Sequence, residues 1–106
     1  MTDIVTVEIN CPDTAVATAI AEALVTRRLA AANIHAPIQS LYHWQGRVDR
    51  AEEIPLVFKT RSDLAPALAE AARALHPYDT PSILTRPVAA TADYAAWIAT
   101  ETAGAA

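Results

Sequence analysis

The spacing of apolar residues switches repeatedly between a period of two and a helical period along this chain, and the order of the switches restricts the possible folds. Ile4 to Ile9 alternates apolar and polar residues, which is typical of a half-buried strand. A helical pattern follows Pro12, and Asp13 is its expected N-cap. We therefore predict that the chain begins with a strand and a helix.

The next pattern is extended and runs from Ala31 to Trp44, but Pro37 interrupts it. Proline lacks the N–H that a strand ladder needs, so we expect two pairing segments separated by a bend. Gln45-Gly46 supplies the turn chemistry of a hairpin, and Glu52 to Thr60 is predicted to return as the next strand. Pro55 predicts an irregular or edge position on that strand.

A second helix is predicted to follow, with Ser62 or Asp63 as its cap. Its apolar stripe consists of Leu64, Leu68, Ala71 and Leu75. Ser82 to Val88 is predicted to be a strand, and Thr91 is expected to cap a short third helix. Residues 102–106 are expected to fray, because nothing in the sequence anchors them.

The predicted order is β-α-β-β-α-β with an extra C-terminal helix, which is the ferredoxin-like pattern of an α+β fold. We expect residues 1–106 to form a single domain around a four-stranded antiparallel sheet. Two helices cover only one face of such a sheet, so the other face must be polar or be covered by something else.

Composition excludes several classes of function. The net charge is −4 and the eight Lys and Arg residues are scattered, so we expect no nucleic-acid partner. No apolar run approaches the length of a transmembrane helix, so we expect no membrane insertion. Cys11 is the single cysteine, which suits a reducing compartment, and a soluble cytoplasmic protein is the expectation.

His76 stands where the second helix must stop, because Pro77 follows it and restricts its backbone. Pro81 closes the same short segment, so the imidazole is expected in a rigid turn. Such a histidine suits a ligand or binding role, and it equally suits a helix C-terminal cap.

Four motifs occur in one order along the chain. They are Tyr42-x-Trp44-x-Gly46, the strand from Glu53 to Thr60, His76-Pro77-Tyr78 with Thr80-Pro81, and Asp93-Tyr94-x-x-Trp97. With these motifs the chain resembles the CutA1 family, small proteins named for divalent-cation tolerance, from about Val5 to Trp97. The resemblance implies that three subunits pack their sheets together as a homotrimer, with the hairpin around Trp44 reaching onto a neighbour.

The resemblance also implies a divalent-metal site, with copper as the metal. In the family pattern a cysteine near the end of the first strand and two adjacent histidines are linked with copper, but here Ile9 and Leu75 occupy two of these positions. His76 is retained and Cys11 lies two residues beyond Ile9, so His76 and Cys11 are the candidate metal ligands. An ordinary half-buried cysteine is the alternative for Cys11. The chain has four possible nitrogen or sulfur donors for a metal, and their spacing matches no recognised ligand motif: Cys11, His35, His43 and His76.

A small-molecule effector pocket between subunits is the rival hypothesis. Its candidate residues combine flat aromatic faces with charge: Tyr42, Trp44, Glu53, Lys59 and Tyr78. Glu53 and Lys59 are six residues apart on one strand and are predicted to point to the same side. In a purely structural or partner-docking trimer, the same two residues would instead pair across the subunit boundary.

No enzyme signature is present, and no catalytic residue is assigned. The serines stand in no Gly-x-Ser-x-Gly elbow, and Cys11 has no sequence signature that places a base beside it. Glu52 and Glu53 are adjacent and so point to opposite faces of a strand. Gly46 and Gly104 are too far apart for a phosphate loop. We therefore expect a binding or signalling module and not an enzyme.

Overall fold

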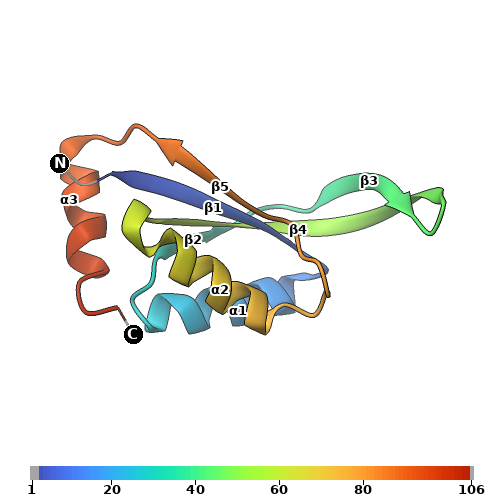
Figure 1. Cartoon of the computed structure of the whole chain (residues 1–106), viewed down its shortest axis with the longest axis horizontal. Helices are drawn as coiled ribbons and strands as arrows, with labels where there is room; N and C mark the ends of the chain where they lie inside the picture. The colour runs from blue at the N-terminus through green and yellow to red at the C-terminus, as the bar shows by residue number, and fades with distance from the viewer. Residues whose placement is uncertain (1–2, 106) are drawn as a thin grey trace.

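The structure is a computed structural model that describes residues 3–105. Its elements are β1 (Ile4–Cys11), α1 (Thr14–Thr26), β2 (Ala31–Ile34), β3 (Ile38–Trp44), β4 (Arg47–Arg61), a 3₁₀ turn (Ser62–Leu64), α2 (Ala65–Leu75), β5 (Ile83–Val88) and α3 (Ala92–Glu101). Figure 1 shows α1 and α2 on one face of the sheet, α3 at one end, and the hairpin of β3 and β4 projecting from the other end.

The α+β class, the antiparallel sheet and the third helix are confirmed, but the strand count is wrong. The sheet has five strands and not four. Its path is β2-β4-β1-β5, and β3 pairs with β4 further along the same strand. The extended stretch forms two strands because the ladder breaks between Ile34 and Ile38, where Pro37 was expected to bend the chain.

The core lies between the sheet and the two helices. Alternation on β1 and β4 gives the sheet one fully buried face, formed by Val5, Val7, Ile9 and Cys11 of β1 and by Ile54, Leu56, Phe58 and Thr60 of β4. The helices complete the core with Ala17, Ile20, Leu24, Leu68 and Ala72. α1 and α2 leave the opposite face of the sheet uncovered, and α3 lies at its end (Figure 1).

The register between β4 and its neighbour changes at the break. Ile34 lies opposite Leu56 and Ile38 lies opposite Glu53, so residues 35–37 stand against only the two residues 54 and 55. One extra residue is thus inserted on the β2–β3 side, as in a β-bulge. The Pro55 carbonyl accepts a hydrogen bond from the His35 N–H at 2.9 Å. Because the N–H and C=O of one strand residue point to the same side, the N–H that Pro55 lacks would also face the break. The irregular position predicted for Pro55 is therefore confirmed.

The hairpin of β3 and β4 forms a long arm. Gln45 and Gly46 both have positive φ values, 51° and 82°, which confirms the expected two-residue turn between Trp44 and Arg47. β4 begins at Arg47, five residues before the predicted Glu52. Every residue from 41 to 50 is exposed, so no other part of residues 3–105 packs over the tip of the arm.

Helix starts were predicted with mixed success. The Asp13 carboxylate accepts the N–H of Val16 at 2.8 Å and caps α1 as expected. Ser62 and Asp63 do not cap α2, because they form a 3₁₀ turn and α2 starts only at Ala65. Within residues 3–105, no helix is long and apolar enough to cross a membrane.

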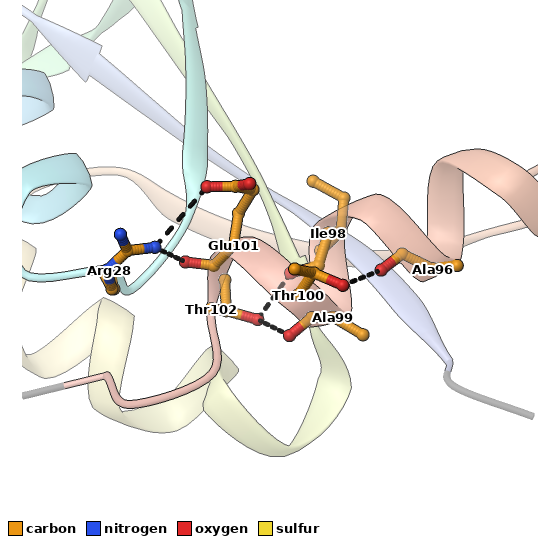
Figure 2. A network of polar contacts seen from close by, with 7 residues as sticks. All are labelled: Arg28, Ala96, Ile98, Ala99, Thr100, Glu101 and Thr102. Carbon is orange, nitrogen blue, oxygen red and sulfur yellow. Dashed lines mark hydrogen bonds and ion pairs between the residues drawn. The ribbon is translucent and has the colours of Figure 1, made fainter.

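Thr102 is anchored, contrary to the fraying expected for residues 102–106, of which residue 106 lies outside the described part of the chain. Arg28 Nη1 donates to the Glu101 carbonyl at 3.1 Å and lies 3.5 Å from the Glu101 carboxylate, as Figure 2 shows. The Thr102 hydroxyl donates to the Ile98 carbonyl at 2.7 Å, and Thr102 is 1% exposed. The Arg28 contacts tie α3 to the turn after α1, a long-range interaction that the tail sequence alone does not show, and the Thr102 bond closes the end of α3 itself.

A buried hydroxyl of β4 gives a first prediction. The Thr60 hydroxyl donates to the Leu29 carbonyl at 2.7 Å, so Thr60→Val leaves that carbonyl unpaired in the core. We expect Thr60→Val to lower the free energy of unfolding by about 1–3 kcal/mol in urea titrations. Thr100 makes a similar bond to Ala96 on an exposed helix surface, so Thr100→Val should change stability by no more than about 0.5 kcal/mol. Equal losses in both variants would contradict this account.

Candidate functional site

His76 joins the end of α2 to the end of β1. It is the C-cap residue of α2 and has an extended backbone. Its Nδ1 accepts the N–H of Tyr78 at 3.1 Å, so the proton lies on Nε2, which donates to the Asn10 carbonyl at 2.9 Å. The backbone of His76 therefore caps the helix, while its ring serves as a brace between two segments.

This brace brings Tyr78 to the end of β1. The His76 and Tyr78 rings meet edge to face, with centroids 4.8 Å apart. Burial raises the pKa of Tyr78, and the charges of Glu53 and then Tyr42 raise it further. Glu53 and Tyr42 therefore each lie within electrostatic range of Tyr78, although the three residues come from separate parts of the chain.

The other two predicted pocket residues lie elsewhere in the chain. Lys59 is six residues from Glu53 along β4, about 20 Å at 3.4 Å per residue. Burial alone lowers the pKa of Lys59. Trp44 lies at the tip of the arm and is 59% exposed. Within residues 3–105, Glu53 and Tyr42 thus lie within electrostatic range of Tyr78, whereas Lys59 and Trp44 lie further along the sheet and the arm.

Cys11 is completely buried beside this group, directly opposite Ile54 on β4. Burial, and after it the charges of Glu53 and Asp13, raises the thiol pKa to about 11. A metal ligand must be a thiolate, and such a pKa opposes its formation. Both nitrogens of His76 are already bonded, so the two residues would have to rearrange to hold copper. Residues 3–105 contain no group of three or more His, Cys, Asp or Glu side chains placed to hold a metal.

A hollow of about 350 Å³ opens on the helix-free face of the sheet. Its lining includes Asn10 of β1, Pro55 of β4, Ile38 of β3 and His35 from the break between β2 and β3. Ile38 lies directly opposite Glu53, and Pro55 is two residues from Glu53 on the same face of β4. Sequence reasoning missed this hollow, because it depends on the extra residue at the break.

Fold and site together describe a small α+β protein with a bare sheet face, a projecting arm and a polar cluster at the end of its first strand. The sequence matches the family described as CutA1 divalent ion tolerance protein over residues 5–101, nearly the whole chain. The chain belongs to this family, which confirms the resemblance noted above.

Relatives and solved structures agree with this assignment. The divalent-cation tolerance protein CutA of Thermus thermophilus is 42% identical over 92 residues, which cover 85% of this chain and 89% of that protein. The crystal structure of CutA from Xylella fastidiosa superimposes with a TM-score of 0.92 at 33% identity and covers 95% of this chain and 99% of that one. The chain spans about half the length of the mammalian relatives, such as bovine Protein CutA, which is 39% identical over 80 residues, 76% of this chain and 46% of that protein.

The Cys11 thiol predicts a pH dependence of stability. Its pKa rises from an ordinary 9.0 to about 11 in the folded chain, so the unfolded chain loses this proton first as the pH increases. Stability should therefore fall between pH 9 and about 11, by about 3 kcal/mol for a shift of two pKa units at 1.36 kcal/mol each. Denaturant titrations of the wild type and Cys11→Ala from pH 8 to 11 should show that the variant lacks this part of the decline. Parallel pH curves for the two proteins would contradict the assignment.

Proposed function

We propose that this chain acts in tolerance of divalent cations as a homotrimeric binding or signalling module in the cytoplasm, and not as an enzyme. The family supports the link to divalent cations. The observation that carries the trimer is the apolar surface of the arm. Leu41, Trp44 and Val48 are 60%, 59% and 64% exposed, and other copies of the chain would cover them.

The bare face of the sheet supports the same arrangement. Ile38, Leu84 and Val88 are exposed there and give it an apolar character that water does not favour. The arm extends the molecule to 46 Å along its longest axis, against 25 and 22 Å along the others, so it can reach a neighbour. In a threefold assembly each arm would lie on an adjacent copy, and the bare faces would meet.

Assembly is tested by the mass of the particle. Light scattering at micromolar concentration should report three chains for the wild type. Trp44→Glu places a charge on the exposed apolar arm and should shift the population toward single chains. Val25→Glu changes an exposed apolar residue on α1, away from the arm, and should leave the trimer intact. A wild type that remains folded as a single chain would refute the trimer.

An effector site at the subunit boundary is the function that the geometry supports best. Glu53 and Tyr42 each lie in electrostatic range of Tyr78, and Glu53 stands opposite Ile38 of the hollow's lining on the bare face. Lys59 and Trp44 are distant within one chain, so they would have to join the site from a neighbouring copy. The trimer would therefore complete a pocket that one chain only begins.

Direct copper binding through His76, with Cys11 in the same coordination sphere, is the second candidate. The position of Cys11 next to Asn10 favours it, because the His76 ring is bonded to the Asn10 carbonyl. Copper prefers imidazole nitrogen and thiolate sulfur. Binding would require His76 to release either Asn10 or the Tyr78 N–H, so the loop after α2 would move as the metal binds.

Calorimetry decides whether copper uses this site. Titration of Cu(II) into His76→Ala should show at least a tenfold loss of affinity relative to the wild type. His43→Ala removes an exposed histidine of the arm and is the matched control, with an expected change below twofold. Equal affinities for the wild type and His76→Ala would remove His76 from any metal-binding role.

A further inference from the structure

Glu53 is a buried acid that has no partner within the chain. The residue is 9% exposed, and no hydrogen bond or ion pair engages its side chain among residues 3–105. The only fully enclosed side-chain polar atom without a hydrogen bond in this part of the chain is Arg61 Nε, so the Glu53 oxygens retain access to the surface. The side chain is thus enclosed on most sides and open on one, from which a positive group could reach its oxygens.

The hollow beside Glu53 provides space for such a group. Its volume of about 350 Å³ is within the range of small-molecule sites. The one acid in its lining, Glu8, is already paired with Arg86 at 2.7 Å. Glu53 lies just outside the lining, opposite Ile38, which belongs to it. Asn10 and Ser82 add neutral polar groups, and the remaining lining is largely apolar. Among the described residues, Glu53 and Lys59 each stand two residues along β4 from a lining residue and have no ion-pair partner, and Glu53 is the acid of the two.

Two tyrosines add to the attraction for a cation. Tyr42 and Tyr78 are each 41% exposed, so part of each ring is accessible. The His76 brace holds Tyr78 at the end of β1, next to the strand that carries Glu53. An aromatic ring attracts a cation over its face, most strongly an organic cation that sheds its water readily. Carboxylate and rings therefore favour the same class of ligand.

We propose that Glu53, at the edge of the hollow, is the receptor for an organic cation, an ammonium or guanidinium group on a short apolar body. This inference rests on the proposed effector site and names the chemistry of its ligand. The carboxylate binds the charged head, the tyrosine rings lie against it, and the apolar lining of the hollow receives the body.

The cation has two possible sources with the same chemistry. One is a free small amine or guanidine. The other is Lys59 of a neighbouring copy, because Lys59 has no ion-pair partner among residues 3–105 and stands on the same face of β4 as Glu53. The experiment below distinguishes these sources.

The test is calorimetric titration with n-butylammonium and n-butylguanidinium, with 1-butanol as the neutral probe. Wild type, Glu53→Gln and Glu52→Gln are compared. Glu52 is exposed and points to the opposite face of β4, so its variant is the matched control for charge. We expect Glu53→Gln to lose at least tenfold in affinity, Glu52→Gln to change less than twofold, and 1-butanol not to bind.

Lys59→Met provides the second arm of the test. If Lys59 of a neighbour already occupies the site, the wild type will not bind the probes, Lys59→Met will bind them, and the double variant Lys59→Met with Glu53→Gln will not. That pattern supports the proposal with the neighbour as source. Probe binding that is unchanged by Glu53→Gln, or no binding in either the wild type or Lys59→Met, would overturn it.

Two further measurements keep the result interpretable. Far-ultraviolet circular dichroism checks that Glu53→Gln folds, and Tyr78→Leu is a second variant that removes one ring and should weaken binding at least threefold. Light scattering on the same samples separates the two proposals. A trimer that binds no probe in either arm refutes only the organic-cation site. Glu53-dependent binding by a single chain refutes only the trimer.

Discussion

The burial of only one face of the sheet is the constraint on which the rest of the molecule depends. Val7 and Phe58 face the two helices, and their neighbours along β1 and β4 must face the other way. α1 and α2 cover the first side and α3 lies at one end (Figure 1), so most of the second side and the arm remain open. Every surface that is available for a ligand or a second copy in our proposals derives from this asymmetry.

The hydrogen bonds of the His76 ring fix the position of the loop after α2 relative to the sheet. The His76 ring bonds to β1 on one side and to the Tyr78 backbone on the other, which fixes both its tautomer and the course of the loop after α2. These two bonds give a reason for the two prolines, Pro77 and Pro81, that follow this histidine. The helix before His76 and the restricted backbone after it keep the ring in the one orientation that satisfies both bonds. The same orientation leaves neither nitrogen free, which is why the geometry favours an organic ligand over direct metal coordination.

Local signals in the sequence were sufficient for most of the fold. Asp13 and the Gln45-Gly46 turn act through neighbours within a few residues, so their roles could be predicted. The anchoring of the chain end by Arg28 could not, because its partner Glu101 is 73 residues away. The candidate site likewise could be predicted only as far as local sequence spacing determines it. Alternation along β4 placed Glu53 and Lys59 on one face, but neither the isolation of Glu53 nor the hollow beside it follows from spacing. Both depend on how β3 meets β4 after the break.

The break itself has a consequence for how such chains can vary in length. Side chains on a strand change sides with each step, so the single surplus residue between Ile34 and Ile38 places these two residues on opposite faces, Ile34 opposite the buried Leu56 and Ile38 opposite Glu53. The turn at Gln45 and Gly46 fixes Tyr42 opposite Asp49, on the same side of β4 as Glu53. Loss of one residue at positions 35–37 would leave that side unchanged and would instead disturb the join between β2 and the arm. The parity of that short segment therefore decides whether β2 and the arm can both pair with the one unbroken strand β4 in their present orientations.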